Sequence, residues 1–270
     1  MIPSLQLDCP RECDRIGDFI RRQLDGAGFR RLVLGMSGGL DSALVGALAA
    51  RAIGPENVHA IVMPYRTSNP ESLAHARLVN EWLGLSWECF DISPMVDAVV
   101  ASDASMDDRR KGNVMARCRM VVWFDRAAKL GALVAGTSNR TESLLGYFTV
   151  FGDGGCSFKT IAHLYKCQVR ELAGHLGVPD AILRKAPSAD LWDGQTDEGE
   201  LGFGYDEADA ILYLLTERGL DEASVVAQGY APEVVQAIQR RMRLNAFKLC
   251  QPPALPVEGR ADLCRGDNNA

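Results

Sequence analysis

The hexapeptide SGGLDS at residues 37–42 combines residue types that bind phosphate. Its two glycines allow a tight turn that brings backbone amides close to a ligand, and its two serines add hydroxyl donors. It opens a helix, and the N-terminus of a helix favours anions. No lysine follows the glycines, so the loop is not a Walker A motif. Asp41 would repel a phosphate unless a divalent cation lay between them, which predicts a role for magnesium.

A bare Ser-Gly-Gly also fits an ordinary strand-to-helix turn with a capping serine, but the whole hexapeptide in this context favours a phosphate loop. The surrounding elements predict a parallel α/β sheet. Short apolar runs without alternation, typical of strands covered on both faces, occur at 32–36, 58–63, 87–92 and 132–135. A helical pattern precedes the first of these runs, at 10–26, and others lie between the runs at 43–51, 70–83 and 114–130.

Strands that alternate with helices imply right-handed βαβ units, so we expect a doubly wound, Rossmann-like parallel sheet. Three further helical patterns, at 166–176, 205–218 and 231–247, predict extra C-terminal helices. We expect residues 1–250 to form one domain and residues 251–270 a flexible tail. The predicted loops are 103–111, 146–160 and 186–204.

Composition excludes several classes of function. The 270 residues carry a net charge of −6, which argues against nucleic acid or a membrane surface as the partner. No apolar run approaches the roughly 20 residues of a membrane span, and the N-terminal segment lacks an apolar signal region. The eight cysteines include no CxxC pair, which predicts a reduced, cytoplasmic setting.

Several longer segments resemble one family. SGGxDS after the first strand is similar to the signature of the N-type ATP pyrophosphatases, and further blocks are similar to NAD synthetases within that group. These blocks are GNVMARCRM at 112–120, GTSNRTE at 136–142, LGYFTVFGDGG at 145–155, LYKCQVREL at 164–172, and PSADLW with GQTDE within 187–198. The resemblance runs from about residue 15 to 250 and implies an adenine nucleotide alpha-hydrolase-like fold.

The resemblance also implies roles for individual residues. Asp41 and Lys166 would be catalytic, and Asp41 and Glu142 would bind Mg2+. Arg117 and Lys248 would contact the second substrate, deamido-NAD, together with the positions that hold Val150 and Ser157. ATP would be bound by Gly35, Met36, Ser37, Gly38, Gly39, Leu40, Asp41, Ser42, Thr137, Lys166 and Ser188.

Three departures from the family pattern fall where the family contacts deamido-NAD. Val150 replaces a lysine, Ser157 an aspartate, and Phe247 a histidine. The loss of a lysine and an aspartate together leaves neither charge buried alone.

The activity implied is that of an ammonia-dependent NAD synthetase, in which ATP adenylates the carboxylate of deamido-NAD and ammonia then forms NAD. We expect ammonia rather than glutamine because 270 residues leave no room for a separate glutaminase domain. Three alternatives remain: amidation of a different carboxylate, which the departures motivate; tRNA modification, which the acidic charge disfavours; and a non-catalytic nucleotide-binding subunit, which intact Asp41, Glu142 and Lys166 disfavour.

The resemblance implies a homodimer as well, with substrate sites at the interface and helix 114–130 as a candidate contact. Its aromatic residues Trp123 and Phe124 are explained equally by burial in the core, and we assign them there together with Trp82.

Overall fold

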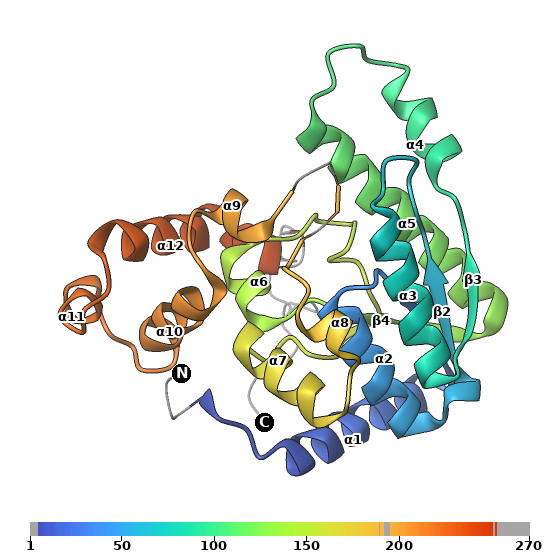
Figure 1. Cartoon of the computed structure of the whole chain (residues 1–270), viewed down its shortest axis with the longest axis horizontal. Helices are drawn as coiled ribbons and strands as arrows, with labels where there is room; N and C mark the ends of the chain where they lie inside the picture. The colour runs from blue at the N-terminus through green and yellow to red at the C-terminus, as the bar shows by residue number, and fades with distance from the viewer. Residues whose placement is uncertain (1–4, 189, 192–194, 251, 253–270) are drawn as a thin grey trace, which may run out of the picture.

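A five-stranded parallel sheet forms the centre of the molecule (Figure 1). The computed structural model describes residues 5–188, 190–191, 195–250 and 252, so nearly all of the predicted tail 251–270 lies outside the described residues. The strand order is β3-β2-β1-β4-β5. The bounds are β1 Arg31–Gly35, β2 Val58–Val62, β3 Ser86–Cys89, β4 Ala132–Gly136 and β5 Phe158–Lys159.

All strand pairs are parallel; for example, Leu32 of β1 pairs with Val58 of β2 and Leu133 of β4. Because β1 lies in the middle, the chain winds outward to β3 on one side and to β5 on the other. The doubly wound α/β fold predicted from the sequence is therefore confirmed.

Helices cover both faces of the sheet. One face packs against α1 (Cys9–Ala27), α2 (Leu40–Ile53), α3 (Pro70–Leu83), α7 (Lys166–His175) and α8 (Asp180–Leu183) through a common apolar core. The other packs against α4 (Ser93–Val100) and α5 (Asp108–Leu130). The short 3₁₀ helix η2 (Pro55–Asn57) leads into β2.

A second group of helices extends away from the sheet at one side (Figure 1). It contains α6 (Arg140–Leu145), α9 (Asp197–Leu201), α10 (Tyr205–Thr216), α11 (Glu222–Val226), α12 (Pro232–Asn245) and the 3₁₀ helix η3 (Ala246–Leu249). These helices have their own apolar cluster, centred on Tyr205 and Ile211. The predicted C-terminal helices are thus confirmed as α7, α10 and α12.

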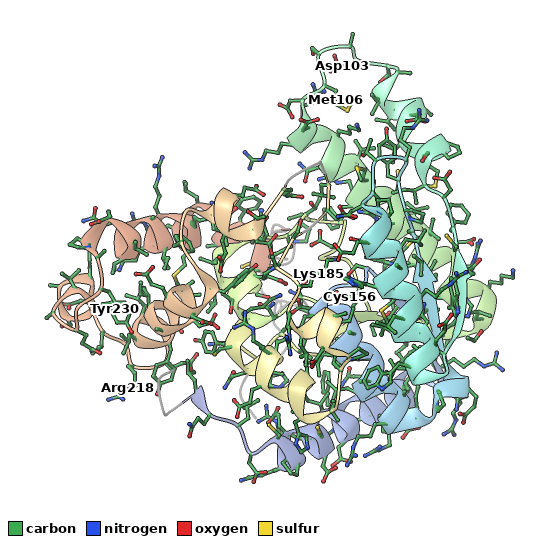
Figure 2. The ribbon with its side chains drawn as sticks, in the orientation of Figure 1. Asp103, Met106, Cys156, Lys185, Arg218 and Tyr230 are labelled. Atoms are coloured by element: carbon green, nitrogen blue, oxygen red, sulfur yellow. The ribbon has the colours of Figure 1, made fainter. Side chains whose placement is uncertain are left out.

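Several local expectations were wrong. The predicted loop 103–111 ends early because Asp107 caps α5: its Oδ1 accepts a hydrogen bond from Arg110 N at 2.7 Å. Asp103 and Met106 lie in the remaining loop, which projects from the body (Figure 2). Trp82 and Phe124 are not core residues, since 37% and 41% of their surfaces are exposed.

Helix α9 likewise occupies part of the predicted loop 186–204, where the Thr196 side chain caps its first turn. The described cysteines are all free thiols. Among the residues that the structure describes, no helix combines the length and the apolar character needed to cross a bilayer.

Candidate active site

The Ser-Gly-Gly loop is ordered by its own serines. The amide of Ser37 donates to Ser42 Oγ at 3.3 Å, and the amide of Gly39 donates to Ser37 Oγ at 3.2 Å. The Ser42 hydroxyl donates to the Gly39 carbonyl at 3.0 Å. The loop therefore holds its turn at the carboxyl end of β1 and at the N-terminus of α2, where an open parallel sheet binds ligands.

Two glycines near this loop have no room for a side chain. A Cβ on Gly38, whose φ is +75°, would lie 2.3 Å from the Ser72 carbonyl oxygen of α3. A Cβ on Gly35 would lie 2.5 Å from the indole ring of Trp123. The loop thus packs closely on α3, and the half-buried Trp123 lies against the end of β1.

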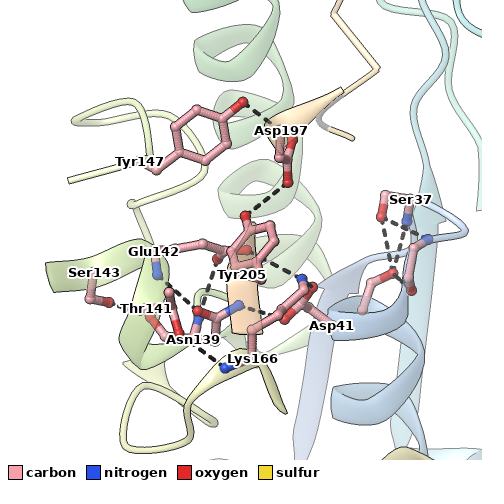
Figure 3. A network of polar contacts seen from close by, with 12 residues as sticks. Ser37, Asp41, Asn139, Thr141, Glu142, Ser143, Tyr147, Lys166, Asp197 and Tyr205 are labelled. Carbon is pink, nitrogen blue, oxygen red and sulfur yellow. Dashed lines mark hydrogen bonds and ion pairs between the residues drawn. The ribbon is translucent and has the colours of Figure 1, made fainter. Parts of the chain in front are cut away.

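A lysine lies between two carboxylates beside the loop (Figure 3). Lys166 Nζ forms an ion pair with Asp41 Oδ2 and lies 3.6 Å from Glu142 Oε1. The side chains of the three residues are 4%, 18% and 17% exposed, in that order. The structure therefore brings together the predicted catalytic pair and the predicted metal ligands, although 125 residues separate Lys166 from Asp41 in the sequence.

A capping box fixes Glu142. The side chain of Asn139 accepts from Glu142 N at 2.9 Å, and Glu142 Oε2 accepts from Asn139 N at 3.2 Å. The amide group of Asn139 also donates to Asp41 Oδ1 at 2.9 Å. A single side chain therefore starts α6 and aligns both carboxylates.

Lys166 is fixed from behind, at the start of α7. Its backbone N donates to Thr141 Oγ1 at 3.0 Å, and the Thr141 hydroxyl donates to the buried Asp209 of α10. Asp209 also accepts from Cys167 N at 2.7 Å. The ammonium group of Lys166 lies 5.2 Å from the centre of the Tyr205 ring.

The electrostatics of the cluster follow from burial and from like charge. Burial raises the pKa of Glu142 to about 8, the Asp41 carboxylate adds to the shift, and Lys166 opposes it. Burial acts to lower the pKa of Lys166, but the charges of Asp41 and Glu142 outweigh it and hold that pKa above its usual value. The cluster therefore favours the protonated form of Glu142 and the charged form of Lys166.

Two adjoining cavities meet at the loop. The smaller has a volume of about 170 Å³ and is lined by Asp41, Glu142 and Lys166. The larger has a volume of about 790 Å³ and extends toward α5, α12 and η3. Both are lined by Ser37, Gly39, Tyr147, Asp153 and Lys185, and by the predicted ATP contacts Thr137 and Ser188.

Most other predicted residues lie on one of these cavities. Leu40 and Ser42 line the smaller cavity, whereas Gly38 packs against α3 instead. The larger cavity is lined by Gly35, Met36, Arg117, Val150 and Lys248. Phe247, one of the three departures, also lines it and is 69% exposed.

Ser157, a predicted substrate contact, is not brought to either cavity. It is exposed, and its Oγ accepts from Val134 N at 3.0 Å. Trp123, which was assigned to the core, lines the larger cavity.

Sequence reasoning missed several acidic and phenolic groups of the site. Asp197 is 5% exposed, accepts from Tyr205 OH at 2.9 Å, and lies 3.2 Å from Tyr147 OH. Burial raises the pKa of Asp197, although both hydroxyls and Lys166 oppose the shift. Burial also raises the pKa of Asp153, which lines both cavities. Asp153 and Asp197 belong to the GDGG and GQTDE segments, so the signal was present as motifs without assigned roles.

Six cationic side chains line the larger cavity: Arg109, Arg117, Arg119, Lys185, Arg241 and Lys248. Within the described part of the chain, none of them has a carboxylate oxygen within 4.0 Å, the distance that defines an ion pair. A cavity with this charge suits ligands with several negative groups.

The parallel sheet, the phosphate loop at a strand end and the cationic cavity define a nucleotide-binding α/β protein. Comparison with known proteins identifies the family within this class. The chain belongs to the NAD synthase family, whose model matches residues 12–252.

Known relatives agree with this placement. An NH3-dependent NAD+ synthetase from Trichlorobacter lovleyi is 50% identical over 242 residues, which are 90% of this chain and 89% of that protein. The structure of an NMN synthetase from Francisella tularensis matches with a TM-score of 0.83 and 30% identity, over 94% of this chain and 100% of that one. An NH3-dependent NAD synthetase from Campylobacter jejuni, solved with the nitrate ion, matches with a TM-score of 0.80 and 31% identity, over 93% and 100% of the two chains.

Proposed function

We propose that the chain is an ammonia-dependent NAD synthetase, a ligase that forms a carbon–nitrogen bond. A carboxylate oxygen of deamido-NAD attacks the α-phosphorus of ATP, the bond to the β-phosphate oxygen breaks, and pyrophosphate leaves. Ammonia then attacks the carbonyl carbon of the adenylate, loses a proton and displaces AMP, which gives NAD.

The observation that carries this proposal is the junction of the two cavities. The smaller cavity contains the phosphate loop and Lys166, and the larger one has the size and charge for a second anionic substrate. Ser37, Gly39, Thr137 and Ser188 line both, so a reacting carboxylate and the α-phosphate of ATP can meet there. Reaction in such a site depends on positioning and on charge stabilisation, and the protein need not supply a nucleophile.

Each predicted residue then has a physical task. The loop from Gly35 to Ser42, with Thr137 and Ser188, holds the ATP phosphates through amides and hydroxyls. Lys166 stabilises the negative charge that develops on the leaving pyrophosphate. Arg117 and Lys248 bind deamido-NAD, and Val150 contributes an apolar contact on the same cavity.

Asp41 and Glu142 fit a magnesium ion. Carboxylate oxygens are the donors that Mg2+ prefers, and Mg2+ is commonly bound through one or two carboxylates together with substrate phosphates and water. The bound ion would neutralise phosphate charge, and its own charge would favour the ionised form of Glu142.

The relatives support the nitrogen source and the substrate. Their names specify NH3 and NAD+, and the chain covers 89% of the length of the Trichlorobacter lovleyi protein. Amidation of a different carboxylate is therefore the less favoured alternative. We further propose a homodimer, a single domain over residues 1–250 and a cytoplasmic location without nucleic acid or membrane partners, as the family resemblance and the composition imply.

The test is pyrophosphate release from ATP with Mg2+ and ammonium, with and without deamido-NAD, while NAD is followed by mass spectrometry. We expect release that depends on deamido-NAD and equals the NAD formed. Asp41→Ala provides the inactive reference. ATP binding without stimulation by deamido-NAD would refute the proposal and direct attention to the departures at Val150 and Phe247.

A further inference from the structure

Three basic side chains gather at one end of the larger cavity. Arg241 comes from α12, Lys248 from η3, and Arg109 from the first turn of α5. The guanidinium carbon of Arg241 lies 6.0 Å from the centre of the Tyr147 ring, and Lys248 Nζ lies 5.5 Å from that of Phe148. This end is therefore built from the C-terminal helices and from the segment that follows α6.

Neutral contacts hold the cluster in place. Lys248 Nζ donates to the carbonyl oxygens of Gly146 at 2.7 Å and Phe148 at 3.0 Å. On the same helix as Arg241, the side chain of Asn245 donates to the Leu145 carbonyl at 3.3 Å. The hydrogen bonds that position this end of the cavity are thus made to neutral carbonyl groups.

Arg109 and Arg241 have no carboxylate within 4.0 Å among the described residues. Eleven arginines outside the cavity have such a partner and others, including Arg240, do not, so Arg241 is set apart by its place on the cavity. Burial lowers the pKa of Lys248; the charge of Arg109 lowers it further, Asp153 opposes the shift, and Arg241 adds to it. Like charges this close favour the binding of an anion.

Arg241 also has an unused donor. Its Nε is buried and has no hydrogen-bond partner among the described residues. A buried donor without an acceptor is unfavourable, and the described residues provide no hydrogen bond to the Arg241 side chain, so its guanidinium group is available to an anion that enters the cavity. A guanidinium group matches the oxygens of a phosphate through two parallel hydrogen bonds.

We propose that Arg241, with Lys248, binds a phosphate group of the second substrate. This assignment rests on the proposed function, because the reacting carboxylate must lie at the α-phosphate of ATP, beside the loop at 37–42. The anionic groups of deamido-NAD that remain are its phosphates. Arg241 lines only the larger cavity, whereas Asp41, Ser42 and Lys166 line only the smaller one, which favours the second substrate over the phosphates of ATP as its ligand.

The test compares Arg241→Gln with Arg240→Gln, which removes an exposed arginine from the same helix. KM for deamido-NAD is measured at saturating ATP, and KM for ATP at saturating deamido-NAD. For Arg241→Gln we expect KM for deamido-NAD to rise roughly 10- to 100-fold, the range for a lost charge-assisted hydrogen bond, with KM for ATP within about twofold of wild type. Arg241→Lys keeps the charge without the planar fork and should fall between.

Arg240→Gln should match wild type. An equal rise in both KM values would overturn the assignment, as would a KM for deamido-NAD that stays unchanged in Arg241→Gln. Thermal unfolding of each variant identifies a folding defect; if Arg241→Gln does not fold, Arg241→Lys carries the test, and an unchanged KM there overturns the assignment. The wild-type reaction tests the proposed function separately, because formation of NAD from deamido-NAD does not depend on any variant.

Discussion

Replacing Lys166 with methionine removes the ammonium group between Asp41 and Glu142 and keeps most of the apolar side chain. The side chain is 4% exposed and its Nζ lies 3.6 Å from Glu142 Oε1, so water cannot readily replace the lost charge. At an effective dielectric constant of about 20, opposite charges about 4 Å apart attract by about 4 kcal/mol. Removing one partner of a buried ion pair costs about 3–5 kcal/mol of the free energy of unfolding.

The protonation of Glu142 sets the pH dependence of this loss. With a pKa of about 8, Glu142 is largely neutral at pH 6, so the variant leaves mainly Asp41 without its partner. At pH 9 Glu142 is mostly ionised, so the wild-type lysine faces two carboxylates. Lys166 keeps its own charge at this pH because its pKa lies above its ordinary value. We therefore expect a loss of about 3 kcal/mol at pH 6 and a larger loss at pH 9.

The same variant should lose catalysis. A preorganised group that stabilises charge in the transition state contributes about 10²- to 10³-fold to kcat, and we expect a loss of this size in pyrophosphate release. Urea unfolding at pH 6 and pH 9 measures stability, and a pyrophosphate assay measures kcat. Lys129→Met, at an exposed position near the end of α5, is the matched control. The reasoning is refuted if Lys166→Met unfolds like the control at both pH values, or if kcat is retained.

Three further variants test other parts of the site. Gly38→Ala should lower the free energy of unfolding by about 2 kcal/mol or more in urea titration and weaken ATP binding in calorimetry, because φ is +75° and its Cβ would meet the Ser72 carbonyl. The ligand-free wild type should lose stability as pH rises from 4.5 to about 8, because folded Glu142 keeps a proton that the unfolded chain releases. Urea unfolding at several pH values should show a flatter pH dependence for Glu142→Gln. Asp209→Ala should cost about 2–3 kcal/mol in urea unfolding and reduce kcat in the pyrophosphate assay, because Thr141 and the start of α7 lose their acceptor; an unchanged kcat would contradict this coupling.

The parts of the fold that were predictable have a strong local signal. Strands β1, β2 and β4 are buried on both faces, so they read as unbroken apolar runs. Strand β5 was missed because its two residues, Phe158 and Lys159, are too few to show a periodicity. Their pairing with Ala135 and Gly136 is fixed by distant parts of the chain. The exposure of Trp82 and Phe124 was missed because an aromatic residue in a helix gives no sign of which face packs.

The site divides in the same way. The phosphate loop was predictable because its residues are adjacent and each has a task in binding an anion. The link from Asn139 to Asp41 was not, although Asn-x-x-Glu at 139–142 is a helix-capping pattern, because the pattern predicts the cap and not the third partner. Arg241 gave no signal at all, since an arginine in an amphipathic helix usually faces solvent.

The charge of the larger cavity has a consequence for the protein in the cell. Six cations share its lining with the carboxylates of Asp153, Asp190 and Glu200, so the empty cavity keeps an excess of positive charge that anionic substrates would balance. A ligand that binds the folded state alone at a hundred times its Kd adds about 2.7 kcal/mol to the free energy of unfolding. When substrates are scarce, more molecules open and become accessible to proteases. We therefore expect the resistance of the folded protein to proteolysis to rise with the concentration of its anionic substrates.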